Sequence, residues 1–276
     1  MSRKFPKVII YAVLIIGALV TLFPIVFLLI NSMKSQTEIV KTPLALPKGL
    51  NLQYIAAAIE KIDLVPSFLV TLLITVVGVL LIVVISSAVA WMMVRYKGKA
   101  STVLLLCFTA SMLIPFQALM YPLISEFDKM GLKNVPGLII MYAGFGLSMS
   151  VFLYHGFIKS IPKSLEEAAI VDGANVFQVY TRVIMPLLKP TTATVAILNG
   201  MWLWNDFMLP FLVIGNKPLK TLTLSVYFAK AENGQYGNAW DLVFPAVLVS
   251  IVPIIVIFLI LQKQIMKGVT AGAVKE

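Results

Sequence analysis

Polar side chains recur at regular spacing in the otherwise apolar stretch that follows Pro190. Thr192, Asn199 and Asp206 are seven residues apart, and Trp202 stands between the last two. Seven residues are about two helical turns, so on a helix these side chains share one face. They offer hydrogen bonds and a charge, and one charge at mid-bilayer costs about 2.5–3.5 kcal/mol. Such a stripe usually faces the interior of a helix bundle or a water-filled path.

The depth of Asp206 leaves a second interpretation open. It lies 16 residues beyond Pro190, about 24 Å along a helix that rises 1.5 Å per residue. At that depth Trp202, Trp204, Asn205 and Asp206 also fit an interfacial belt at the membrane surface. The residues alone do not decide between pathway and belt.

Residue types for catalysis or metal binding are scarce in this chain. His155 is the only histidine and Cys107 the only cysteine, so neither a Cys/His metal cluster nor a disulfide can form within it. Gly98-Lys99 lacks the earlier glycine and the following hydroxyl residue of a phosphate-binding loop. An intramembrane enzyme is disfavoured because no nucleophile–base pair is evident. We expect a non-catalytic chain that binds no metal or cofactor itself.

The longest polar interruption in the second half of the chain is residues 160–190, called loop 160–190 below. Ser164 with Glu167 three residues later predicts a capping box, with a helix starting at Leu165. Gly173 can take the positive φ that ends it, and Asn175 can cap a second short helix. We expect Pro186 and Pro190 to break that second helix. The pattern predicts two short helices joined by a sharp elbow.

This loop resembles the EAA signature of ABC importer membrane subunits. Glu167-Ala168-Ala169 is followed after three residues by Gly173, and later by Val183-Ile184-Met185-Pro186, where Val183 and Met185 replace isoleucine and leucine. In that family the loop forms coupling helices that insert into a cleft of a cytoplasmic ATPase subunit. The resemblance implies ATPase-coupling roles for Ser164, Glu167, Ala168, Ala169, Asp172, Gly173, Ala174, Phe177 and Pro186. Small alanines allow close approach, and Glu167 offers an anion to a basic residue of the partner.

The composition indicates a multi-pass membrane protein. Of 276 residues, 60% are hydrophobic and 12% charged, against about 25% charged in soluble domains. Six apolar runs are long enough for spans, which need roughly 20 residues each. We predict an all-α membrane protein forming a single domain over residues 1–276, with spans at about 8–30, 68–90, 101–125, 136–158, 191–214 and 242–262.

Basic residues predict the orientation. With the N-terminus inside, the four cytoplasmic segments carry 13 of the 22 Lys and Arg residues, and the short loop Arg95–Lys99 is the clearest indicator. Both termini and loop 160–190 are then cytoplasmic. The net charge of +10 is scattered over span ends rather than gathered in one patch, so we expect no nucleic-acid partner.

Three further segments resemble carbohydrate importers of the maltose type, in particular their smaller permease subunit. Trp204-Asn205-Asp206-Phe207 with Pro210 resembles a feature of sugar permeases, which favours Asn199, Trp202, Asn205 and Asp206 as a candidate translocation path. Thr221-Leu222-Thr223-Leu224 resembles the start of an outer loop that reaches toward an external binding protein. The tail from Gln262 resembles one that touches the ATPase, which implies contacts by Thr270, Ala271 and Gly272.

These observations predict a type I ABC importer permease of the bacterial cytoplasmic membrane. The implied partners are a second, non-identical permease subunit, two ATPase subunits that hold ATP and Mg, an extracellular solute-binding protein, a carbohydrate substrate and the lipid bilayer. Two alternatives remain: import of a non-sugar solute such as a glycerophosphate or a polyamine, or ion-coupled secondary transport. The second would need intramembrane acidic residues, and Asp206 is the only one within the predicted spans.

Overall fold

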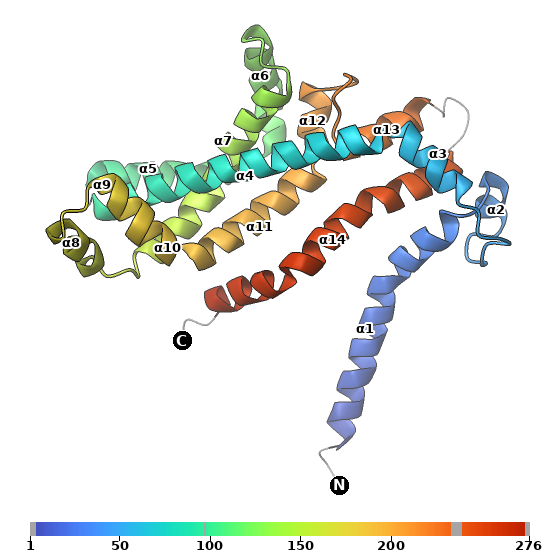
Figure 1. Cartoon of the computed structure of the whole chain (residues 1–276), viewed down its shortest axis with the longest axis horizontal. Coiled ribbons are helices and arrows are strands. Elements are labelled where there is room, and N and C mark those ends of the chain that lie inside the picture. The colour runs from blue at the N-terminus through green and yellow to red at the C-terminus, as the bar shows by residue number, and fades with distance from the viewer. Residues whose placement is uncertain (1–3, 97, 233–238, 274–276) are drawn as a thin grey trace. The chain divides into compact units, whose positions relative to one another are not determined.

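The computed structural model describes residues 4–96, 98–232 and 239–273, and within these ranges the regular structure is helical (Figure 1). The chain forms two compact units, each built from segments distant in sequence. One comprises residues 1–67 and 222–257, and the other comprises residues 68–221 and 258–276. The prediction of an all-α protein is confirmed, while the single-domain organisation stays a prediction.

In the first unit a small apolar core packs α3, α13 and α14 together. Its helices are α1 (Lys4–Asn31), α2 (Gln36–Lys41), α3 (Gln53–Lys61), α13 (Leu222–Glu232) and the start of α14 (Trp240–Ala273). Ala58 and Ile62 pack with Ala229 and Ala246, all of them buried. The Ser67 and Ser225 hydroxyls lie 2.6 Å apart and share a buried hydrogen bond. These contacts hold the segment after α1 against α13 and α14.

A buried lysine organises the loop that follows α1. Lys34 is 1% exposed, and its ammonium donates to the carbonyls of Thr42 (3.0 Å) and Pro43 (3.1 Å) and to Asn31 Oδ1 (3.3 Å). Burial lowers the pKa of Lys34, and the Glu38 carboxylate acts in the opposite direction. The three oxygens compensate for the water that the ammonium has lost, so the lysine ties the end of α1 to the Pro-rich segment.

The second unit is organised around α7. Its elements are α4 (Leu64–Arg95, from Phe68 onward), α5 (Lys99–Ser111), α6 (Phe116–Lys129), α7 (Val135–Ile158), α8 (Ser164–Val171), α9 (Val176–Gln178), the π-helix η1 (Val179–Ile184), α10 (Met185–Leu187), α11 (Lys189–Asn205) and α12 (Met208–Val213). Helix α7 contacts α5, α11 and α12. Gly146 marks a close approach, since a Cβ there would overlap Ile82 of α4 and Asn199 of α11.

Three helices in the described ranges are long and apolar enough to cross a membrane: Lys7–Asn31 within α1, α4 and α7. The segment of the predicted span 101–125 is divided between two helices. Helices α5 and α6 meet at 103°, because Pro115 has no N–H to donate and disfavours helical backbone in the residue before it. The described helices provide three spans, or four if this bent pair is one, so six spans stay a prediction.

The other two predicted spans also differ from the structure in their helix boundaries. The predicted span 191–214 is split, because the backbone is extended at Asp206 (φ −69°, ψ 137°) and α12 begins two residues later. The Asp206 carboxylate accepts the backbone N–H of Met208 (3.2 Å) and Leu209 (3.3 Å), which caps the new helix. Helix α14 runs to Ala273, beyond the predicted limit of 262.

Candidate functional site

Loop 160–190 folds into the two arms and elbow that the sequence predicts. The first arm, α8, ends at Val171 with Asp172 as its C-cap, and Gly173 adopts a φ of +85°. An added Cβ at Gly173 would meet no atom within 4 Å, so the backbone conformation alone favours glycine there. Asn175 caps the second arm, where it and Gln178 exchange hydrogen bonds of 2.9 Å. Gly173 and Asn175 confirm the predicted elbow.

The predicted start of the first arm is wrong by one residue. Ser164 lies inside α8, and the N-cap is Lys163, which has helical backbone angles and makes no side-chain cap bond. The helix begins earlier because the Glu166 N–H bonds the Lys163 carbonyl and extends the turn that starts at Pro162. Glu167 therefore takes no part in a capping box and pairs with Lys163 at 3.0 Å.

The second arm continues through Pro186 instead of ending there. Helical backbone runs from α9 through the π-turn of η1 into α10, with Pro186 in the first turn of α10. The only loss at Pro186 is its own N–H, which the first turn of a helix does not need. The chain turns at Leu188, and α11 then begins with Pro190 in its first turn.

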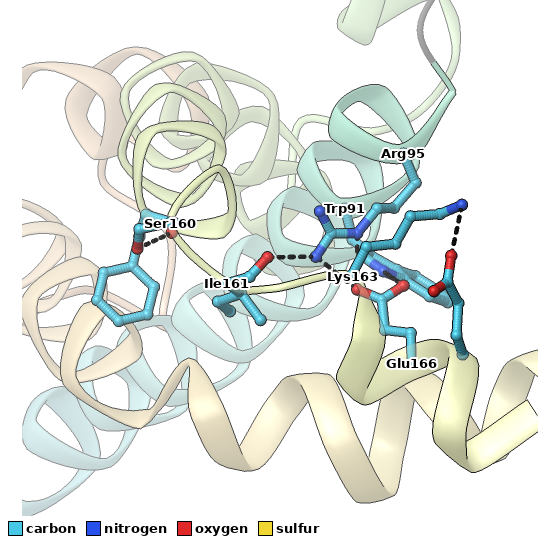
Figure 2. A network of polar contacts seen from close by, with 8 residues as sticks. Trp91, Arg95, Ser160, Ile161, Lys163 and Glu166 are labelled. Carbon is cyan, nitrogen blue, oxygen red and sulfur yellow. Dashed lines mark hydrogen bonds and ion pairs between the residues drawn. The ribbon is translucent and has the colours of Figure 1, made fainter.

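A buried ion pair anchors the first arm to the end of α4 (Figure 2). Glu166 accepts from Arg95 Nε at 2.6 Å and from Trp91 Nε1 at 3.0 Å, and Arg95 Nη2 also donates to the Ile161 carbonyl at 3.1 Å. The side chain of Glu166 is 7% exposed and that of Arg95 is 19% exposed. Every hydrogen-bonding group of this anchor is charged or aimed at a charge, which makes the contacts strong and directional.

A second anchor joins the other arm to the same helix. Tyr180 of η1 stacks on Trp91 with ring centroids 5.6 Å apart, and its hydroxyl lies 2.7 Å from Ser87 Oγ. Ser87 also contacts Met185 Sδ at 3.6 Å. Trp91 belongs to both anchors, so α8 and η1 are fastened to one face of α4. Figure 1 shows α8, α9 and α10 gathered at this end of α4.

The surface of the elbow is apolar and open. Val171 is 87% exposed and Phe177 is 73% exposed, with Leu165, Ile170 and Val176 exposed beside them. Of the residues given coupling roles, Ser164, Glu167, Ala168, Asp172, Gly173, Phe177 and Pro186 are exposed, and Ala169 and Ala174 are partly exposed. Large exposed apolar side chains gathered on one projection are typical of a protein-docking surface.

The sequence did not identify Glu166 and Arg95 as a pair. They are 71 residues apart in the chain. Glu166 is adjacent to the motif residue Glu167. Successive side chains on a helix point about 100° apart, so the two glutamates face different directions. Arg95 was noticed only as a positive charge at a span end. The available signal was two successive glutamates, of which a docked helix can bury only one.

The polar stripe on α11 faces α7. Tyr142 donates to Asp206 Oδ2 at 2.8 Å, Tyr154 donates to Thr192 Oγ1 at 2.9 Å, and Asn199 Nδ2 donates to Ser150 Oγ at 3.0 Å.

The candidate path residues therefore differ in exposure. Asn199 is buried in this helix contact, and Asp206 is partly buried. Trp202 packs edge-on against Tyr142, with ring centroids 5.3 Å apart, and is exposed. Asn205 is also exposed and donates to the Met201 carbonyl at 2.8 Å. The stripe thus combines interhelical hydrogen bonds with two exposed residues, Trp202 and Asn205, which are called the exposed rim below.

The remaining site predictions concern the end of α14 and metal binding. Thr270, Ala271 and Gly272 lie in the last turns of α14, where the structure describes the backbone but not the side chains. Within the described residues, no three His, Cys, Asp or Glu side chains are grouped so that they could hold a metal ion.

Comparisons with known proteins match this architecture. Residues 82–270 match the family described as binding-protein-dependent transport system inner membrane component. The probable starch degradation products transport system permease protein AmyC of Thermoanaerobacterium thermosulfurigenes is 40% identical over 95% of this chain and 94% of its own. The multiple sugar-binding transport system permease protein MsmG of Streptococcus mutans is 35% identical over 96% of both. The structure of a bacterial ABC transporter involved in alginate import aligns with a TM-score of 0.79 at 24% identity, covering 95% of this chain and 98% of that one.

Proposed function

The chain belongs to the family of binding-protein-dependent transport system inner membrane components, and on that premise we propose that it carries a sugar or oligosaccharide across the membrane. It is a permease subunit of an ABC importer, an integral membrane protein without catalytic activity of its own. Relatives whose names specify starch degradation products, multiple sugars and melibiose with raffinose and stachyose support the sugar class.

The finer assembly is part of the proposal. The chain pairs with a second, non-identical permease in the bacterial cytoplasmic membrane. Two ATPase subunits bind ATP and Mg on the cytoplasmic side, and an external binding protein delivers the solute. Each apolar side chain on the elbow needs a partner to remove it from water, which supports a docked ATPase.

The anchoring of loop 160–190 carries the mechanical part of this proposal. Both arms are held to α4 through Glu166 and Tyr180. An ATPase that binds the exposed elbow is therefore linked through these contacts to the end of α4. When the ATPase pair closes, α4 moves together with the elbow, whereas a flexible loop would absorb the movement. The contacts of the Thr270–Gly272 tail with the ATPase are proposed on the resemblance alone.

The solute path is proposed along the exposed rim of α11. Trp202 and Asn205 are the accessible members of the stripe, and an aromatic ring beside an amide suits the apolar face and hydroxyl groups of a sugar. Asn199 and Asp206 are held by α7 in this conformation. Rotation of α11 against α7 during alternating access would bring them to the path.

Co-purification tests the assembly. The chain, tagged at its N-terminus to leave the C-terminal tail free, is isolated from native membranes in mild detergent. We expect a second multi-span protein, an ATPase with a Walker A motif and, after cross-linking, a binding protein that can be tested with sugars. Recovery of the chain alone or as a homo-oligomer after cross-linking would contradict the assembly.

A variant on the elbow supplies the control. Val171→Asp with Phe177→Asp makes two highly exposed side chains acidic without touching either anchor. The proposal predicts that this variant loses the ATPase and keeps the second permease. Equal recovery of the ATPase would contradict docking at the elbow.

A further inference from the structure

A pocket of about 800 Å³ opens between the ends of α4, α5 and α7, and its lining includes no residue of the elbow surface or of the polar stripe. Its lining comprises Met93, Val94, Arg95, Gly98, Lys99, Ser101, Thr102, Leu105, His155 and Lys159. All these residues belong to the second unit. The space is large enough for a phosphate-bearing group together with part of its glycerol backbone.

The polar side of this pocket is basic. Lys99 and Lys159 contribute two positive charges, Thr102 contributes a hydroxyl group, and none of the ten lining residues is acidic. Arg95 adds a guanidinium that is paired with Glu166, and the Ser101 hydroxyl already donates to the Tyr96 carbonyl. Within the described part of the chain, Lys99 and Lys159 make no ion pair. The two unpaired ammonium groups therefore favour an anionic ligand in this pocket.

His155 and Arg95 each leave hydrogen-bonding capacity in the pocket. His155 is 9% exposed, and its ring makes no hydrogen bond to any described residue although it lines the space. Arg95 uses Nε and Nη2 in the anchor, and Nη1 has no partner among the described residues. Neither group is closed off from water, since the only fully enclosed, unpaired side-chain nitrogen or oxygen among the described residues is Thr75 Oγ1. Both groups can therefore bond a ligand that enters the pocket.

The first turn of α5 adds to the positive electrostatic potential of the pocket. Its N-cap is Gly98, whose extended backbone (φ −137°, ψ 167°) offers no side chain to the free N–H groups at the helix start. Such N–H groups favour an anion. The remaining lining residues Met93, Val94 and Leu105 are apolar, which does not suit a freely diffusing ion.

We propose that this pocket binds the phosphate headgroup of an anionic phospholipid, such as phosphatidylglycerol, from the cytoplasmic leaflet. Arg95, Lys99 and Lys159 hold the phosphate, and Met93, Val94 and Leu105 contact the glycerol and the start of the acyl chains. Basic pockets between helices at this membrane face fit such headgroups. The assignment rests on the proposed inward orientation of these helix ends.

Arg95 links this pocket to the proposed function. The guanidinium that faces the pocket also holds Glu166 of loop 160–190. A phosphate on Nη1 keeps the guanidinium in the orientation that Glu166 needs, so lipid binding stabilises the first anchor. We therefore expect anionic lipid to stimulate solute-coupled ATP hydrolysis by the complete transporter.

Binding is tested on the purified complete transporter by native mass spectrometry with phosphatidylglycerol. The pocket variant is Lys99→Gln/Lys159→Gln, and Lys7→Gln/Lys48→Gln is the matched control, because it removes two exposed lysines outside the pocket. The pocket variant should bind phosphatidylglycerol about thirtyfold more weakly, since each of the two lysines near a lipid surface contributes about 1 kcal/mol. The control should bind like the wild type.

Four outcomes would overturn the assignment. The first is equal affinity of the pocket variant and the control. The second is displacement of the lipid by inorganic phosphate, which would assign the pocket to a free anion. The third is equal binding of phosphatidylcholine, which would show that no anionic headgroup is selected. The fourth is loss of the second permease from the pocket variant, which would assign the pocket to a protein contact.

A steric variant keeps the test informative if the charge variant is poorly expressed. Thr102→Phe places a ring in the pocket and leaves every charge in place, and it should also weaken phosphatidylglycerol binding. A normal affinity for this variant would count against the site. Failure of the whole transporter to assemble remains distinguishable, because the ATPase and second permease are seen in the same spectrum.

Discussion

Replacing Glu166 by alanine should release the first arm of loop 160–190 from α4. The substitution removes the acceptor of Trp91 Nε1 and of Arg95 Nε, and it leaves a guanidinium that is only 19% exposed without its counter-charge. Breaking a buried ion pair from one side costs about 3–5 kcal/mol. Solvent at Arg95 screens part of this, so we take the lower limit, about 3 kcal/mol, which is about a hundredfold in the docking equilibrium of α8.

The neighbouring glutamate provides a matched control. Glu167 pairs with Lys163 on the same helix, and both side chains are more than half exposed. Exposed pairs contribute about 0.2–1 kcal/mol, so Glu167→Ala should shift the docking of α8 by at most about fivefold. The two variants remove the same chemical group one residue apart, and only tertiary burial distinguishes them.

Hydrogen exchange of peptides covering residues 161–175 measures this docking directly in the purified chain. Exchange through undocking should be about a hundredfold faster in Glu166→Ala and nearly unchanged in Glu167→Ala. In proteoliposomes with the complete transporter, Glu166→Ala should also hydrolyse ATP with little solute uptake. Equal exchange in the two variants would refute the reasoning, because the ion pair would then contribute nothing to the anchor.

Three other substitutions test separate parts of the structure. Gly173→Asp should stall uptake while the membrane level of the protein on an immunoblot stays normal, because a side chain at φ +85° costs about 1–2 kcal/mol and disturbs the elbow; normal uptake would contradict the coupling role. Lys34→Met removes the donor of the buried Asn31 Oδ1, at about 1–3 kcal/mol, and of the partly buried Thr42 and Pro43 carbonyls, so residues 35–50 should become protease-sensitive in right-side-out vesicles, whereas Lys41→Met should not have this effect. Asn199→Leu should lower thermal stability only slightly, since interhelical hydrogen bonds in membranes average about 0.6 kcal/mol, yet reduce solute uptake; unchanged uptake would remove Asn199 from the proposed path.

The features that the sequence determined by itself are those with local causes. Long apolar runs specify membrane helices because each must satisfy its backbone internally. Gly173 and Asn175 specify the elbow through φ preference and capping. The spacing of the EAA-like motif was sufficient to predict the family, because it is carried by residues close together in the chain.

The local rules failed where neighbouring groups compete for one role. Ser164 and Asn175 both precede a favourable partner three residues later, yet only Asn175 forms a capping box. The turn at Pro162 and Lys163 had already begun the helix before Ser164. Asp206 is a similar case: its carboxylate caps α12, so a continuous apolar run became two helices.

Only the tertiary structure decided which polar groups are paired. Glu166 is buried by Arg95, 71 residues away, and Asp206 meets Tyr142, 64 residues away. The pocket beside Arg95 likewise collects its lining from three helices. Sequence periodicity gives the face of a helix on which a side chain lies, but the identity of the facing helix depends on how the whole chain packs, and burial is a property of that packing.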